Sequence, residues 1–252
     1  MRAACTITVR MKSRRLPSKA IAPLQGKPMI EHLIQRLKCA KEPADIIICT
    51  STNPQDDILK NIAQLCGVKC YRGSEDDVLR RLLDAADTEQ ADFLVSTTGD
   101  NPLTDPHYVD KIILKFKETG ADYITCLGLP LGAFSYGVNV EALRRVVLSK
   151  KEIDTEIWGA YFSESGSFRA VELDVEEDLK RPELRLTVDT EEDLRLMQLV
   201  FGSLYRDGDV FELRDVIRLL DSHPDWKEIN KHVQQRKAPS LRTAEQNRMN
   251  HG

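Results

Sequence analysis

Residues 3–19 read AACTITVRMKSRRLPSK, and this stretch decides how the rest of the chain is interpreted. It begins with a short β-branched run, Ala3–Val9, which is typical of a buried strand. Five cations then fall within ten residues, at Arg10, Lys12, Arg14, Arg15 and Lys19. A charge run of this kind is usually a solvated loop. Its position at the carboxyl end of the leading strand favours a phosphate-binding loop, because guanidinium and ammonium groups make charge-assisted hydrogen bonds to phosphate.

Strand and helix patterns alternate over the residues that follow. Further strands are expected at Ile46–Thr50, Val68–Tyr71, Phe93–Thr97 and Tyr123–Leu127. Apolar spacing predicts helices over 28–40, 54–66, 75–89 and 105–119. Asn53-Pro54 and Asp105-Pro106 are helix-start signals. The repeat predicts a doubly wound α/β fold with a mainly parallel sheet and ligands beyond the carboxyl ends of the strands.

The sequence pattern changes from residue 128, where several glycine and proline residues fall within a short stretch. We interpret 128–183 as an insertion or arm that returns a last strand to the sheet. Helices are expected at 140–149, 152–164, 190–205 and 211–236, and strands at 168–173 and 184–188. Residues 1–237 are thus predicted to form one domain. Residues 238–252, with Leu241 and Met249 as their only large apolar residues, are predicted to be a disordered tail.

Composition excludes several classes of protein. Lys and Arg number 36 against 40 Asp and Glu, so the net charge of −4 argues against a general nucleic-acid binder. No apolar run approaches the roughly 18 residues that span a bilayer, and the amino-terminal apolar stretch is too short for a signal peptide. Six scattered cysteines without a CxxC pair are typical of reduced thiols. We expect a cytoplasmic protein without membrane insertion.

Two further strand ends carry carboxylates. In Thr97-Thr98-Gly99-Asp100-Asn101-Pro102-Leu103, an aspartate beside a glycine that gives a ligand room suits Mg²⁺, although an ordinary Asp-Asn turn fits equally well. In Arg185-Leu186-Thr187-Val188-Asp189-Thr190-Glu191-Glu192-Asp193-Leu194, Thr190 could cap a helix whose first turn carries three acids. Asp189 is the acid that this cap does not explain.

These motifs together resemble the CMP-sugar synthetases: the acylneuraminate and 3-deoxy-manno-octulosonate cytidylyltransferases and their spore-coat polysaccharide relatives. The opening signature is matched by Arg10, Met11, Ser13, Arg15, Leu16, Pro17, Lys19 and Gly26-Lys27-Pro28-Met29. The resemblance, over about residues 3–200, implies that Arg10, Ser13, Arg15 and Lys19 grip the CTP phosphates, with Met11 in the same loop. Lys12 and Ser18 depart from the pattern, which has a small residue and a glycine there.

The resemblance also assigns the other motifs. Arg72-Gly73-Ser74-Glu75-Asp76-Asp77-Val78-Leu79 taken alone is a capped helix start with Ser74 at the N-cap. It is similar to a stretch bordering the cytosine pocket of the spore-coat branch, which implies that Arg72 and Ser74 bind nucleotide. The turn Thr98-Gly99-Asp100 resembles the family's metal-binding turn, and Asp189 stands where the family completes its Mg²⁺ site.

The acceptor side of the resemblance is weaker. Phe134-Ser135-Tyr136-Gly137 and Glu156–Phe162 occupy the acceptor positions but lack the family's histidine and acidic residues. Tyr136, Glu156 and Trp158 are the acceptor-binding candidates, while an aromatic cluster of this kind is also typical of a core or a dimer interface. Because the region is short for a core of its own, its aromatic residues predict a homodimer in which the 128–183 segment reaches the partner.

The resemblance implies a Mg²⁺-dependent cytidylyltransferase that uses Arg10, Arg15, Lys19 and Asp100 in catalysis. CMP would pass from CTP to a sugar acid or related small-molecule acceptor, with release of pyrophosphate, in the synthesis of surface-polysaccharide or glycoconjugate precursors. Three alternatives stay open. The acceptor could be a non-sugar phosphate or phosphonate, or the chain could be a glycosyltransferase of the same fold or a non-catalytic nucleotide-binding protein.

Overall fold

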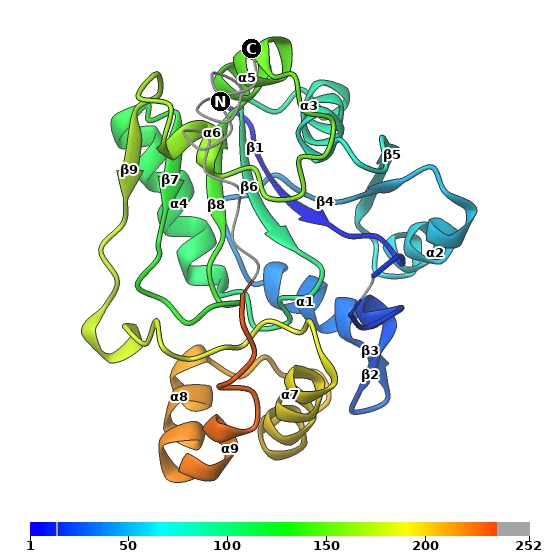
Figure 1. Ribbon diagram of the computed structural model, residues 1–252, viewed down its shortest axis with the longest axis vertical. Helices are drawn as coiled ribbons and strands as arrows, with labels where there is room; N and C mark the ends of the chain where they lie inside the picture. The colour runs from blue at the N-terminus through cyan, green and yellow to red at the C-terminus, as the bar shows by residue number, and fades with distance from the viewer. Residues whose placement is uncertain (14, 236–252) are drawn as a thin grey trace, which may run out of the picture.

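The computed structural model describes residues 1–13 and 15–235, which are built around one seven-stranded sheet (Figure 1). Its order is β5-β4-β1-β6-β8-β7-β9. The strands are β1 (Ala3–Thr8), β4 (Asp45–Ser51), β5 (Lys69–Gly73), β6 (Phe93–Thr98), β7 (Tyr123–Thr125), β8 (Tyr136–Asn139) and β9 (Ala170–Glu172), with a separate hairpin of β2 (Pro23–Leu24) and β3 (Lys27–Pro28). In the main sheet the pairings are parallel except those of β8 with β6 and β7. The predicted mainly parallel α/β fold is confirmed.

Helices cover both faces of this sheet. They are α1 (Met29–Leu37), α2 (Asp57–Leu65), α3 (Val78–Glu89), α4 (Pro106–Thr119), α5 (Val140–Ser149), α6 (Ala160–Ser163), α7 (Glu191–Leu204), α8 (Leu213–Ser222) and α9 (Pro224–Glu228), with short 3₁₀ turns η1 (Lys19–Ile21), η2 (Pro54–Asp56) and η3 (Glu177–Leu179). The start signals act as expected, because the side chains of Asn53 and Asp105 accept hydrogen bonds from backbone N–H groups of the first turns.

The apolar faces of these helices form two cores. Residues of α1, α2, α4, α7 and α8 pack into the larger core, and residues of α3, α5 and α6 pack into the smaller one on the other side. In Figure 1 α7, α8 and α9 lie together below the sheet, away from α3 and α5 at the top. No helix within the described residues is both long and apolar enough to span a membrane.

The largest departure from the sequence expectation is β8, a strand that the pattern of residues 134–139 does not predict. It lies inside the sheet, antiparallel to both neighbours. Gly137 allows this position, because a Cβ there would meet Ile112 Cγ2 at 2.5 Å and Phe93 Cζ at 2.6 Å. The 128–183 segment therefore supplies an inner strand, which was not predicted, as well as the outer strand β9. Its interpretation as an insertion or arm stays a prediction.

Three other boundaries also differ. Residues 184–188 form a single bridge, from Arg185 to Leu131, in place of a strand. The helix expected at 152–164 is reduced to α6. The helix expected at 211–236 is divided at His223, because Pro224 has no N–H to continue α8. The predicted tail, 238–252, lies outside the described residues.

The aromatic residues of the 128–183 segment are packed within the chain. Phe162 and Trp158 are buried in the smaller core, where Phe162 stacks on Tyr123 at a ring separation of 5.3 Å and Trp158 meets Tyr136 at 5.8 Å. The argument that these rings need a partner subunit is therefore wrong. The homodimer itself stays a prediction.

Candidate active site

The basic loop that follows β1 meets two acidic strand ends at one point. Lys19 is the first residue of η1, and its Nζ lies 2.5 Å from Asp100 Oδ2 and 2.7 Å from Asp189 Oδ1. Asp100 lies two residues after the end of β6, and Asp189 lies two residues before the start of α7. Three residues selected from three separate motifs thus converge at the carboxyl edge of the sheet, where open α/β sheets bind their ligands.

Cations surround Asp189 on both carboxylate oxygens. Arg15 Nη2 is 2.9 Å from Oδ1, and Arg185 Nη2 donates to Oδ2 at 3.0 Å. Burial alone would raise the pKa of this carboxyl, but the charges of Lys19 and Arg15 and the hydrogen bond from Arg185 hold its pKa below the usual range. Burial opposes the charge of Lys19 in the same way, and Asp100 and Asp189 nevertheless raise the pKa of its ammonium group. Both groups are therefore charged at neutral pH.

The turn that carries Asp100 is fixed by its neighbours. Thr98 Oγ1 donates to Asp100 Oδ1, and the backbone N–H of Val188 donates to the carbonyl of Asp100 at 2.8 Å. Gly99 has a packing role, since a Cβ there would lie 2.6 Å from Val9 Cγ2 of the neighbouring chain segment. The turn is thereby held against both the first strand and the segment leading to Asp189.

A buried carboxylate anchors the beginning of the basic loop. Asp56 accepts from the backbone N–H of Met11 at 2.7 Å and from the hydroxyl of Ser51 at 2.5 Å. Ser18 N–H donates to the Met11 carbonyl at 3.2 Å, which closes the loop, and Ser13 Oγ accepts from the N–H of Leu16 at 3.4 Å. The sequence pattern gives no signal for Asp56 beyond an acid in a helix first turn, so its role was missed.

Arg10 lies on the other side of the loop, apart from the Lys19 contacts. It donates to the carbonyl of Glu75 at 3.1 Å and to Asp76 Oδ1 at 3.2 Å, and it lies 3.6 Å from Glu156 Oε2. Lys12 is paired with Glu75 at 3.0 Å. Arg10 therefore links Glu75 and Asp76, in the loop after β5, to Glu156, so a predicted acceptor residue lies beside this loop.

Arg72 and Ser74 have structural partners in this conformation. Arg72 donates to the carbonyls of Ser51 at 2.8 Å and Asn53 at 2.9 Å, and it pairs with Asp57 at 2.6 Å. The expected N-cap role of Ser74 is wrong, because Asp77 caps α3 by accepting from the N–H of Arg80. Ser74 Oγ instead accepts from the N–H of Asp77 at 3.1 Å.

A buried arginine that the sequence analysis did not select supports the same loop. Arg81 is 2% exposed and donates to the carbonyls of Ser74 and Glu75. Because Arg10 also donates to the Glu75 carbonyl, the two arginines hold this part of the loop from both sides. The apolar spacing of α3 does not predict that Arg81 is buried, because arginine usually lies on the solvated face of a helix.

The three acceptor candidates are not equivalent. Glu156 is about half exposed and contacts Arg10 at the edge of the site. Tyr136 and Trp158 contact each other and also Tyr123, so their rings belong to the smaller core. Of the three, Glu156 is the one that the structure brings to the basic loop.

The paired carboxylates suit a hard divalent cation. Asp100 and Asp189 each place an oxygen beside the same ammonium nitrogen, so the two carboxylates converge on one position that a cation already occupies. Mg²⁺ commonly takes one or two carboxylates and completes its shell with water and phosphate oxygens. In the described part of the chain no group of three or more His, Cys, Asp or Glu side chains forms an alternative metal site. The residues present fit Mg²⁺ bound together with a nucleotide.

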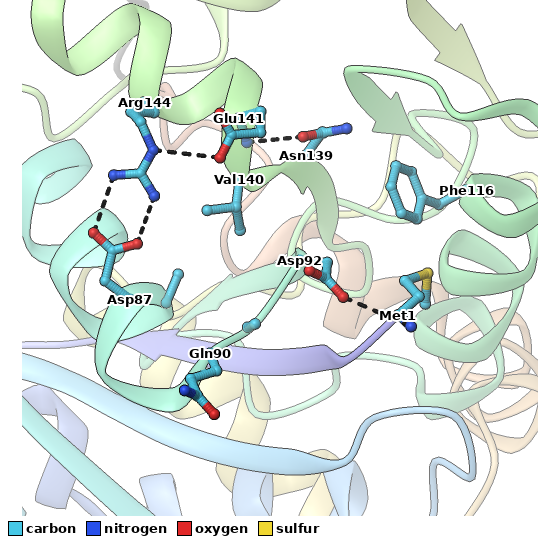
Figure 2. Close-up of a pocket in the computed structure, with 11 residues that line it drawn as sticks. Met1, Asp87, Gln90, Asp92, Phe116, Asn139, Val140, Glu141 and Arg144 are labelled. Atoms are coloured by element: carbon cyan, nitrogen blue, oxygen red, sulfur yellow. Dashed lines mark hydrogen bonds and ion pairs between the residues drawn. The ribbon is translucent and has the colours of Figure 1, made fainter.

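A hollow of about 610 Å³ lies elsewhere, near the amino ends of β1 and β6 (Figure 2). Figure 2 shows Arg144 directed at Asp87 and Glu141, with ion pairs of 2.6 Å and 3.4 Å, and Met1 beside Asp92. These charges neutralise one another, and none of the residues selected from the sequence motifs lines the hollow. The chemistry therefore gathers at the opposite edge of the sheet.

Comparison with known proteins finds similar sequences and similar structures. The family model described as cytidylyltransferase matches residues 4–199. The uncharacterised protein MJ1063 of Methanocaldococcus jannaschii is 33% identical over 234 residues, which cover 91% of this chain and 95% of that protein. The spore coat polysaccharide biosynthesis protein SpsF of Bacillus subtilis is 29% identical over 226 residues, which cover 87% of this chain and 94% of that protein. An 8-amino-3,8-dideoxy-manno-octulosonate cytidylyltransferase of Shewanella baltica is 28% identical over 165 residues, 63% of each chain.

Solved structures share the fold. A cytidylyltransferase from Leptospira borgpetersenii superimposes with a TM-score of 0.83 at 24% identity, covering 94% of this chain and all of that one. The CMP:2-keto-3-deoxy-manno-octonic acid synthetase complexed with CTP gives a TM-score of 0.64 at 17% identity, covering 81% of this chain and all of the other.

Proposed function

The chain belongs to the cytidylyltransferase family, and we propose that it transfers CMP from CTP to a sugar acid or related small acceptor with release of pyrophosphate. The observation that carries this proposal is the convergence of Lys19, Asp100 and Asp189, with Arg15 beside them, at the carboxyl edge of the sheet. A cationic loop facing two carboxylates is suited to a nucleoside triphosphate and its divalent cation.

In such a reaction an acceptor oxygen forms a bond to the α-phosphorus in line with the bond that breaks. The electron pair of the broken bond leaves on the oxygen that bridged the α- and β-phosphorus atoms and becomes part of pyrophosphate, and the acceptor hydroxyl loses its proton to solvent. The protein has to position the two reactants and neutralise the phosphate charge. Arg15 and Lys19 are the cations that would bind the β- and γ-phosphates. Asp100 and Asp189 would hold Mg²⁺, which supplies charge neutralisation at the leaving phosphates when it is bound.

Arg10 is proposed to act nearer the acceptor than to the outer phosphates. It pairs with Asp76 and lies close to Glu156, at the side of the site where an acceptor would enter. This placement differs from the role that the family resemblance implies, in which Arg10 grips phosphate with Lys19. Asp76 and Glu156 would compete with any phosphate for its guanidinium group.

The names of the relatives support a sugar-related acceptor. One relative acts in spore coat polysaccharide biosynthesis, and another is named for an eight-carbon amino sugar acid. The CTP of a structural neighbour supports the choice of nucleotide. We therefore propose that the product serves the assembly of a surface polysaccharide or glycoconjugate, and that the reaction takes place in the cytoplasm.

A homodimer is part of this proposal. Its support is a run of exposed apolar side chains in the segment that borders the site: Leu148 is 81% exposed, Ile153 is 69% and Ile157 is 41%. These three side chains lie within ten residues of one another in sequence, and a partner subunit would cover them. Light scattering at micromolar concentration tests it, and the mass of a single 28.6 kDa chain would contradict it.

The deciding experiment is a screen for Mg²⁺-dependent pyrophosphate release. CTP, UTP, GTP and ATP are each combined with sugar acids, sugar phosphates and phosphonates. We expect release with CTP and a sugar acid, and formation of the CMP-sugar. Pyrophosphate release only with a phosphonate or another phosphate compound would show that the acceptor belongs to that class and is not a sugar acid. Turnover of a nucleotide-sugar without pyrophosphate would indicate a glycosyltransferase, and binding of CTP without turnover would indicate a non-catalytic protein.

A further inference from the structure

The last described residues of the chain reach the carboxylate of Asp189 through one buried arginine. Arg185 lies four residues before Asp189 and is 8% exposed. Its Nη2 donates to Asp189 Oδ2 at 3.0 Å and to Asp193 Oδ2 at 2.9 Å, and its Nε donates to Asp193 Oδ1 at 2.8 Å. The guanidinium group is therefore shared between the candidate metal ligand and a second, fully buried carboxylate.

Asp193 in turn fixes the backbone at Asp189. Its Oδ2 accepts from the N–H of Asp189 at 2.9 Å and from the N–H of Thr190 at 3.1 Å. Arg185 thus holds the side chain of Asp189 while Asp193 holds its main chain. Because Oδ2 is engaged by Arg185, Oδ1 is the oxygen that faces Lys19 and Arg15. The network sets which oxygen points into the site.

Two residues after α9 complete the network. Asn230 is 3% exposed, and its Nδ2 donates to the Arg185 carbonyl at 3.0 Å and to Asp193 Oδ1 at 2.8 Å. Gln235 Oε1 accepts from Arg185 Nη1 at 2.7 Å. Both residues lie beyond residue 199, where the match to the family model ends. The segment that follows α9 therefore contributes to the site from outside the matched region.

We propose that Asn230 and Gln235 are positioning residues, through which the carboxy-terminal segment holds Arg185 and Asp193 and so orients Asp189 toward its cation. The inference rests on the proposed function of Asp189. A buried polar network stabilises one arrangement when every member has a partner, and it loses that arrangement when one partner is removed. Loss of Asn230 leaves Asp193 Oδ1 with Arg185 alone and removes the tie on the Arg185 carbonyl.

The test compares Asn230→Ala, Gln235→Ala and Gln235→Glu in the whole chain. Mn²⁺ binding in the presence of CTP is measured by water-proton relaxation, and the Mg²⁺ concentration for half-maximal activity is measured in parallel. In the two alanine variants we expect the dissociation constant of Mn²⁺ and the Mg²⁺ concentration for half-maximal activity each to rise about tenfold. This change is equivalent to about 1.4 kcal/mol. High Mg²⁺ should restore kcat. Gln235→Glu keeps an acceptor oxygen for Arg185 and should behave like the wild type.

Arg181→Ala is the matched control. Arg181 pairs with Asp221 of α8 at 2.8 Å, so it also ties the residues before Arg185 to the carboxy-terminal helices, but it does not contact the network. The Arg181→Ala variant should have the same Mn²⁺ dissociation constant and the same half-maximal Mg²⁺ concentration as the wild type. Metal constants in Asn230→Ala and Gln235→Ala that equal those of Arg181→Ala would overturn the inference. Gln235 is exposed, so its variants decide the matter if Asn230→Ala does not fold.

Asp189→Asn separates this inference from the proposed function. If Asp189→Asn keeps wild-type Mn²⁺ binding and activity, the metal assignment itself is wrong. If Asp189→Asn loses both while the alanine variants keep them, the positioning role is wrong and the proposed function stands.

Discussion

Removal of the Lys19 ammonium should make the protein bind a divalent cation more tightly in the absence of nucleotide. Its Nζ lies 2.5 Å from Asp100 and 2.7 Å from Asp189, so it occupies the position between the two carboxylates. A metal ion that enters without CTP has to displace this ammonium group, which then has no phosphate to move to. The perturbation is Lys19→Met, which keeps an unbranched side chain one heavy atom shorter and removes its charge.

The expected magnitude follows from the two contacts. A hydrogen bond to a charged group contributes about 1.5–3 kcal/mol, and each 1.4 kcal/mol is a tenfold change in affinity. The side chains are partly accessible to water, so we use the lower end of that range for the pair together. Lys19→Met should therefore raise the affinity for Mn²⁺ alone by about tenfold. Water-proton relaxation or calorimetry without nucleotide measures this affinity.

Lys12→Met provides the matched control. Lys12 is in the same loop, and its removal changes the net charge equally, but its partner is Glu75 at 3.0 Å. This variant should bind Mn²⁺ alone as weakly as the wild type does. Equal affinity in Lys19→Met and the wild type would refute the reasoning, and an equal gain in both variants would show that overall charge is the cause. With CTP present, Lys19→Met should lose activity.

Other predictions concern single residues of the site and the sheet. Asp100→Asn should keep the fold, checked by circular dichroism, and lose most Mg²⁺-dependent turnover, because a neutral amide is a poor ligand for that ion; near-wild-type turnover would disprove the metal assignment. Arg15→Ala should weaken CTP binding by about 1.5–3 kcal/mol in calorimetry, and unchanged affinity would disprove the phosphate contact. Gly137→Ala should lower the free energy of unfolding in urea by about 1–3 kcal/mol, because its Cβ would overlap Ile112; unchanged stability would contradict the packing described. Since the pKa of Asp189 lies below its unfolded value of 3.8, its ionised form stabilises the fold above that pH. The difference in unfolding free energy between wild type and Asp189→Asn should shrink as pH falls below 3.8, and a pH-independent difference would contradict this.

The site residues that the sequence analysis identified lie next to local sequence patterns, such as a strand or a helix start. Asp100 lies two residues after the apolar strand β6, and Lys19 lies in the loop that follows the apolar strand β1. Strand ends of a parallel sheet meet at one edge, so their proximity follows from the repeat. Asp189 was found because the helix cap of Thr190 left it unexplained. Strands β1, β4, β5, β6 and β7 and helices α1 to α4 were found for the same reason, since each lies in a regular pattern bounded by turn signals. The short β2–β3 hairpin was not predicted.

The residues that were missed depend on packing between distant segments. Asp56 accepts from the N–H of Met11, 45 residues before it, and Asn230 donates to Asp193, 37 residues before it, so nothing near either residue indicates its partner. Arg81 donates to carbonyls only six and seven residues before it, but the pattern of α3 gives no sign that an arginine side chain turns back to the preceding loop. Strand β8 was missed because four residues that include Gly137 carry no alternating pattern, and the neighbours that require the glycine come from β6 and α4. Tertiary contacts decided these features over local propensity.

The position of β8 has a consequence for the order in which the chain can fold. Among the described strands β7 pairs with β8 and β9, and both of these come later in the sequence. When β7 emerges from the ribosome, strands β1, β4, β5 and β6 have all been synthesised and can pair with one another. The other edge of β6 is still unpaired, because its partner β8 has not yet been synthesised. An open strand edge of this kind can pair with another chain. Nascent chains that stop between residues 98 and 136 should therefore aggregate more readily than chains that extend past Asn139.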